Sequence, residues 1–107
     1  MKHITATELA ARLADTGAQA PMLLDVRELN EYAICHIAGS QLIPMHSVPE
    51  RIQELDPDVE IVCICHHGAR SASVAAFLER NGFSQLTNLT GGIHAWATQV
   101  DPSMPTY

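Results

Sequence analysis

Short apolar segments alternate along this chain with segments of helical periodicity. Residues 60–64 include four consecutive apolar positions and run directly into a polar loop, 65–71, after which Val74, Phe77 and Leu78 share one helical face. Strands that are apolar on both faces are buried by helices packed above and below a parallel sheet. The pattern therefore predicts an α/β fold with a mainly parallel sheet flanked by helices on both faces.

The other elements follow from capping signals and turn residues. Thr5 and Glu8 have the spacing of a capping box, which predicts a helix over 6–16 that ends in a left-handed cap at Gly17. The remaining predicted strands are 22–26, 41–43 and 83–89, and the remaining predicted helices are 29–34, 48–55, 71–81 and 93–98. Because the chain has 107 residues and no linker or low-complexity segment, we expect a single domain, 1–107.

Composition and charge argue against several classes of protein. Hydrophobic residues make up 47% of the chain, but no apolar run approaches the ~20 residues that span a bilayer, and no signal-peptide core is present at the N-terminus. We therefore expect a cytoplasmic protein without a membrane partner. The net charge is −6, from 12 acidic and 6 basic residues without a Lys/Arg cluster, which argues against nucleic acid as a partner.

The three cysteines differ in their predicted environments. Their odd number and the lack of an export signal indicate free thiols, and Cys35 and Cys63 are expected to be inert and buried. A disulfide between Cys63 and Cys65 would be strained, because the two residues are two positions apart at a strand end. Cys63, Cys65, His66 and His67 are metal-ligand types, but their spacing does not suit a zinc site, so no metal is predicted.

Cys65 occupies the position where open parallel sheets bind ligands, between the carboxyl end of a strand and the start of a helix. If the loop curls around this cysteine, its backbone N–H groups converge on the sulfur, and the helix dipole adds positive potential that stabilises a thiolate. Gly68 permits unusual backbone angles and Arg70 contributes a permanent cation. These properties suit a nucleophile that carries a persulfide, whose terminal sulfur is held by fixed dipoles.

Four segments in order resemble the rhodanese family: LLDVRE at 23–28, HIAGS with IP at 36–44, CHHGARS at 65–71 and LTGGIHAW at 89–96. The resemblance implies that Cys65 is the persulfide nucleophile. It places Asp25 and Arg27 near the active loop at neighbouring strand ends, where we interpret them first as a structural ion pair with a supporting role at the site. One departure is Cys35, where the family more often has glycine. The implied substrate-binding residues are His66, His67, Gly68, Ala69, Arg70 and Ser71.

The function that this resemblance implies is sulfur transfer. Cys65 would take a sulfane sulfur from thiosulfate or a persulfide donor and pass it to cyanide, a thiol or a protein thiol, with no cofactor besides the covalent persulfide. A sulfur carrier with little turnover remains an alternative. A phosphatase or arsenate reductase is less favoured, because loops in those relatives typically hold five residues between Cys and Arg, whereas this chain has four. No chemistry is assigned to His36, His46 or His94.

Overall fold

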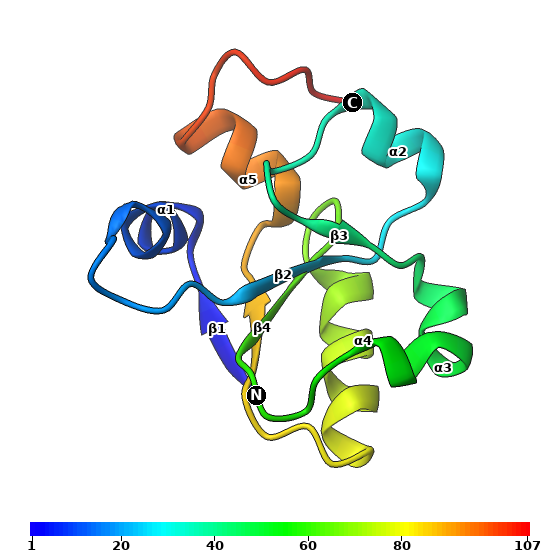
Figure 1. Ribbon diagram of the computed structural model, residues 1–107. Helices are drawn as coiled ribbons and strands as arrows, with labels where there is room; N and C mark the ends of the chain where they lie inside the picture. Colours follow the sequence, from blue (N-terminus) through cyan, green and yellow to red (C-terminus); the bar gives the residue numbers. More distant parts are fainter.

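A five-stranded sheet with all strands parallel runs through the molecule (Figure 1). It is seen in a computed structural model that describes residues 1–107. The strands lie in the order β1-β5-β4-β2-β3. Their bounds are β1 Lys2–Ile4, β2 Met22–Asp25, β3 Gln41–Leu42, β4 Ile61–Ile64 and β5 Leu86–Leu89. The helices are α1 Ala6–Ala14, α2 Leu29–Ile34, α3 Val48–Arg51, α4 Ala69–Arg80 and α5 Gly92–Gln99.

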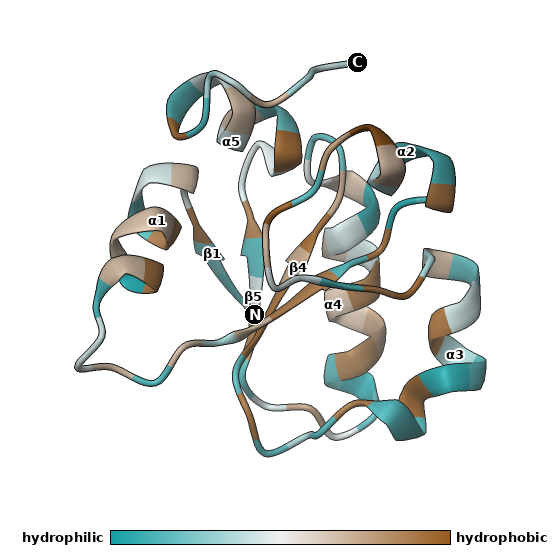
Figure 2. Cartoon of the chain, turned by 45° about the horizontal axis from the view of Figure 1, so that its top comes forward, coloured by the Kyte–Doolittle hydropathy of each residue, from teal (hydrophilic) through white to brown (hydrophobic).

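Two apolar cores cover the two faces of the sheet. Successive strand residues point to opposite faces, so Ile61 and Cys63 of β4 join one core while Val62 and Ile64 join the other. The first core is closed by α3 and α4, and the second by α1 and α5. Figure 2 shows the hydrophobic colouring along β4, the strand between β5 and β2. This burial on both faces explains why β4 reads as a continuous apolar run.

The register of the parallel strands brings three carboxyl ends to one edge of the sheet. Asp25 at the end of β2 is level with Ile64 at the end of β4, and Cys63 is level with Asn88 of β5. The residues that follow these strands therefore meet at this edge. The predicted fold class is confirmed, and no helix is both long and apolar enough to cross a membrane.

The first helix confirms its predicted start but not its predicted end. Thr5 and Glu8 form the reciprocal capping box. The helix stops at Ala14, and Gly17 does not adopt a left-handed conformation, so the expected glycine cap is wrong. Instead, Asp15 takes an extended conformation and its side chain accepts a hydrogen bond from the Gly17 N–H at 3.0 Å. The short polar side chain of Asp15 competes with the helix for backbone groups.

Other boundaries differ from the predictions where tertiary contacts outweigh local pattern. The predicted helix 48–55 is broken into α3 and a 3-10 turn, Ile52–Glu54, and another 3-10 turn, Met45–Ser47, precedes it. Strand β5 begins only at Leu86. Strand β1 was not predicted, because Lys2 and His3 are exposed and the segment is a strand through its pairing with β5.

Candidate active site

The sulfur of Cys65 is enclosed by the loop that follows β4. Cys65 is 1% exposed, and its Sγ accepts hydrogen bonds from the Gly68 N–H at 3.0 Å and from the Ser71 hydroxyl at 3.2 Å. Gly68 adopts a φ of 119°, which suits glycine, and α4 begins immediately after it at Ala69. The loop therefore curls around the sulfur and places it at the positive end of α4.

The carbonyl groups of this loop are held by neighbouring elements. The Cys65 carbonyl accepts from the Ile93 N–H at 2.8 Å, and the His66 carbonyl accepts from the His94 N–H at 3.1 Å. These two N–H groups belong to the first turn of α5, where backbone donors have no partner within the helix. The start of α5 thus anchors the loop by its carbonyl oxygens.

The guanidinium of Arg70 is directed to a carboxylate on α2. Its Nη1 and Nη2 donate to Glu31 Oε1 and Oε2 at 2.7 and 2.9 Å. These bonds lower the pKa of Glu31 to about 2 and raise the pKa of Arg70. The positive charge that Arg70 was expected to contribute to the Cys65 loop is therefore offset by Glu31. The groups that contact the sulfur are the Gly68 N–H and the Ser71 hydroxyl.

Asp25 and Arg27 form a fully buried ion pair at the end of β2, the strand that pairs with β4. The Arg27 side chain donates to Asp25 Oδ2 at 2.7 Å, and both side chains are almost inaccessible to solvent. Arg27 also donates to the Cys35 carbonyl at 2.7 Å. The thiols of Cys35 and Cys65 lie in the cores on opposite faces of the sheet. The contact of Cys35 with the ion pair is therefore made by its backbone carbonyl and not by its thiol.

Comparison with known proteins identifies the family to which this domain belongs. The profile of the rhodanese-like domain matches residues 5–99. The chain belongs to the rhodanese-like domain family. It is 41% identical over 91 residues to thiosulfate sulfurtransferase GlpE of Pseudomonas paraeruginosa, an alignment that covers 85% of this chain and 80% of that protein.

Two further relatives show how widely the domain is used. The chain is 36% identical to the chloroplastic rhodanese-like/PpiC domain-containing protein 12 of Arabidopsis thaliana, matching over its whole length but spanning only 38% of that longer protein. The crystal structure of a rhodanese-like domain protein from Staphylococcus aureus superposes with a TM-score of 0.85 at 33% identity, covering 100% of this chain and 99% of that one. The resemblance read from the sequence is thus confirmed.

Tyr107 of this rhodanese-like domain contacts residues around the Cys65 loop and was not predicted from the sequence. Its hydroxyl accepts from Arg27 Nη1 at 2.9 Å and donates to Glu31 Oε2 at 3.0 Å, while its ring stacks on His66 with centroids 4.0 Å apart. Segment 101–107 runs from α5 to the side of α2 (Figure 1). No local pattern marks Tyr107, because its partners lie far away in the sequence.

Three histidines gather beside the Cys65 loop of the domain. The ring of His67 lies 4.0 Å from that of His66 and 5.2 Å from that of His94, measured between centroids. Burial and the neighbouring His67 lower the pKa of His66. His94 received no role from the sequence, although its position in the first turn of the helix after β5 could have placed it at this edge. No group of three or more His, Cys, Asp or Glu side chains is arranged to hold a metal ion.

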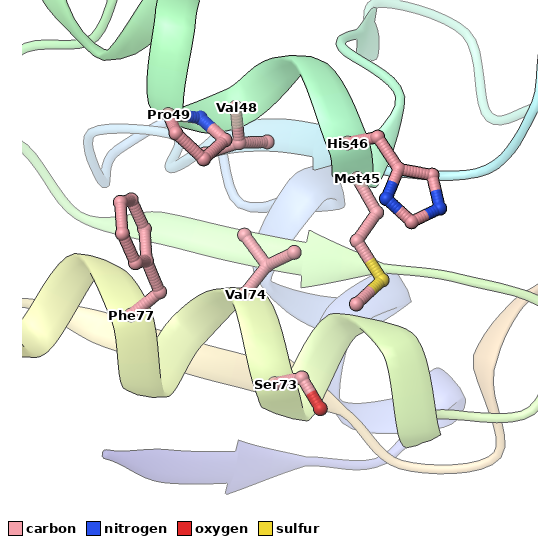
Figure 3. Close-up of a pocket in the computed structure, with 7 residues that line it drawn as sticks. All are labelled: Met45, His46, Val48, Pro49, Ser73, Val74 and Phe77. Atoms are coloured by element: carbon pink, nitrogen blue, oxygen red, sulfur yellow. The ribbon is translucent and has the colours of Figure 1, made fainter.

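An apolar pocket of about 250 Å³ lies between α4 and the segment around α3 (Figure 3). Val74 and Phe77 of α4 face Met45, Val48 and Pro49 across it. His46 and Ser73 supply the polar groups of its lining. His46 therefore belongs to this pocket, whereas His66, His67 and His94 gather beside the Cys65 loop.

Gly92 is required by the close approach of α5 to the loop. It has a φ of 59°, and a Cβ there would overlap the carbonyl groups of Cys65 and His66. We expect Gly92→Ala to displace the loop and, if Cys65 loads sulfur as the resemblance implies, to reduce that loading at least about tenfold. Gly82→Ala is the matched control, because Gly82 also has a positive φ but nothing within 4 Å of an added Cβ. Equal loading of the two variants would contradict this account.

The ion pair of Glu31 predicts a pH-dependent contribution to stability. The pKa of Glu31 is lowered in the folded protein from about 4.5 to about 2, so its ion pair stabilises the fold above pH 4.5 and is lost as the pH falls through 2. Urea unfolding should therefore show Glu31→Gln less stable than wild type at pH 7, with the difference shrinking between pH 4.5 and 2. Glu50→Gln, an exposed glutamate outside any ion pair, is the control. A difference that does not change with pH would contradict the prediction.

Proposed function

We propose that this rhodanese-like domain is a sulfurtransferase that carries a transferable sulfur atom as a persulfide on Cys65. The observation that carries the proposal is the pair of donors, Gly68 N–H and Ser71 hydroxyl, aimed at a buried sulfur next to the first turn of α4. Such donors stabilise negative charge on sulfur, both in the attacking thiolate and in the persulfide that follows. The likeness to a thiosulfate sulfurtransferase supports the same reaction.

In the first half of the proposed reaction, the Cys65 thiolate attacks the sulfane sulfur of thiosulfate. A new S–S bond forms to Sγ while the bond between the sulfane sulfur and the sulfonate sulfur breaks, and its electron pair leaves with sulfite. With a persulfide donor, a thiolate leaves instead. The N–H groups of the loop and the dipole of α4 stabilise the negative charge on the outer sulfur.

In the second half, a nucleophile removes the outer sulfur. Cyanide attacks it through carbon, thiocyanate forms, and the electron pair of the S–S bond returns to Sγ. A thiol acceptor would leave as its own persulfide after deprotonation. Because sulfur passes between nucleophiles without net oxidation, the proposed reaction uses no redox cofactor.

The loop is better matched to a terminal sulfur than to a tetrahedral oxyanion. Four residues separate Cys65 from Arg70, and both guanidinium hydrogen bonds of Arg70 go to Glu31 rather than into the loop. A phosphatase would need a ring of donors around three oxygens and a cation facing them. Sulfur transfer is therefore the favoured reaction of this site.

Intact-mass spectrometry tests the proposal. After treatment with thiosulfate, the purified protein should gain one sulfur, about 32 Da, and cyanide or dithiothreitol should remove it. Loading with a protein persulfide but not with thiosulfate would assign the domain to the carrier class instead. No gain with any sulfane donor would overturn the proposal.

A further inference from the structure

Asn88 is a buried polar side chain in β5, a strand whose leucines, Leu86 and Leu89, pack in the two cores. It is 5% exposed and lies in β5 beside Cys63 of β4. A buried amide without hydrogen-bond partners destabilises the fold, so the partners of Asn88 account for its burial. Its Nδ2 donates to the Gly68 carbonyl at 3.2 Å, and its Oδ1 accepts from the Ser71 hydroxyl at 2.5 Å. Both ends of the amide therefore contact the Cys65 loop.

The orientation of this amide follows from its partners. The Gly68 carbonyl can only accept a hydrogen bond, so it requires the NH₂ group of Asn88 on its side. The amide oxygen must then face Ser71. Asn88 thus presents an acceptor, and not a donor, to the hydroxyl group that also contacts Cys65.

The Ser71 hydroxyl has one proton and three acceptors within reach. Its Oγ lies 2.5 Å from Asn88 Oδ1 and 3.2 Å from both Cys65 Sγ and the Gly68 carbonyl oxygen. When Cys65 is a thiol, the hydroxyl can donate to Asn88 and accept from the S–H group. When the sulfur is negatively charged, the proton is needed at Sγ, and the bond to Asn88 is lost.

We propose that Asn88 is a positioning residue that governs the ionisation of Cys65 by competing with its sulfur for the proton of Ser71. Asn88 stabilises the arrangement in which the hydroxyl turns away from sulfur, and it thereby favours the thiol until a negative charge on sulfur draws the proton back. The inference concerns Cys65 as the nucleophile and in that respect rests on the proposed function. No covalent bond changes in this step, because only the direction of one O–H group differs.

Other titratable groups surround Cys65 and are the same in every variant of Asn88. Cys63 precedes it in β4, His66 and His67 follow it in the loop, His94 approaches from α5, and Arg70 is paired with Glu31. Burial raises the pKa of Cys63 to about 12, so this thiol stays protonated at neutral pH. Differences between variants at Asn88 therefore arise from its two contacts, with the Ser71 hydroxyl and with the Gly68 carbonyl, and the Ser71→Ala background separates the two.

Two substitutions should act in opposite directions. Asn88→Ala removes the competing acceptor, so the rate at which iodoacetamide alkylates Cys65 at pH 7 should rise about threefold and the pH midpoint of alkylation should fall. Asn88→Asp supplies a stronger acceptor and a negative charge, so the rate should fall about fivefold or more and the midpoint should rise. A purely structural role would move both variants in the same direction.

The experiment follows alkylation of Cys65 by peptide mass over a range of pH, with Cys65→Ser as the blank. Thr87→Val, the adjacent buried position whose side chain points to the opposite face, is the matched control and should leave the midpoint unchanged. Combining Asn88→Ala with Ser71→Ala should remove the effect of the former, since no hydroxyl proton remains to be redistributed.

Several outcomes would overturn the inference. They are shifts of the same sign in the two Asn88 variants, or an effect of Asn88→Ala that persists without the Ser71 hydroxyl. If a variant of Asn88 does not fold, Ser71→Ala alone tests the step, because alkylation should slow when the thiolate loses this donor, and an equal or faster rate would contradict it. Alkylation needs no sulfur donor, so a failure here is distinct from a failure of persulfide loading.

Discussion

Cys65→Ser is expected to abolish sulfur loading and turnover while leaving the fold intact. The substitution removes the proposed nucleophile, and serine at this position retains the donors from Gly68 and Ser71 as partners for its oxygen. Intact-mass spectrometry should then detect no gain of about 32 Da after thiosulfate treatment. Circular dichroism and urea unfolding should show a folded protein with a cooperative transition.

Cys63→Ser provides the contrast to this first prediction. Cys63 is 0% exposed, and burial raises its pKa to about 12, so it is a core side chain and not a nucleophile at neutral pH. A hydroxyl buried there without a partner should reduce stability by roughly 1–3 kcal/mol while persulfide still forms on Cys65. If instead Cys63→Ser lost sulfur loading and Cys65→Ser lost only stability, the nucleophile would be misassigned.

The second large effect is expected from Asp25→Ala. This change leaves the guanidinium of Arg27, 0% exposed, without its carboxylate partner. Removing one member of a buried ion pair typically reduces stability by about 3–5 kcal/mol, because the remaining charge stays buried and uncompensated. Urea unfolding at pH 7 measures the change in the free energy of unfolding. The backbone at Cys35 and the C-terminal segment at Tyr107 should also loosen, since Arg27 donates hydrogen bonds to the Cys35 carbonyl and the Tyr107 hydroxyl.

A surface ion pair supplies the control for Asp25. Glu54 pairs with Arg51, and both side chains are well exposed, so Glu54→Gln should produce no measurable change in the free energy of unfolding. Similar losses in Asp25→Ala and Glu54→Gln would mean that burial of the Asp25–Arg27 pair does not decide its importance.

The local sequence predicted the bounds of an element correctly where the signals lie within that element. Helix α2 has the predicted bounds, 29–34, and β4 differs by one residue from its prediction, because apolar spacing and turn residues act over a few positions. Strand β1 and the breaks around α3 depend on neighbours. Lys2 and His3 are exposed and lie in a strand through their pairing with Thr87 and Asn88.

The sequence by itself determined the family, the parallel α/β fold and the loop that starts at Cys65, because those signals are contiguous residues in a strand, a loop and a helix. Only the tertiary structure decided the partners of that loop. Arg70 forms hydrogen bonds with Glu31, which is 39 positions away in the sequence. The hydrogen bond between Ser71 and Asn88 spans 17 positions, and the one between Arg27 and Tyr107 spans 80. Pairings of this kind depend on which strand ends and helices the sheet order brings together, and no local spacing records them.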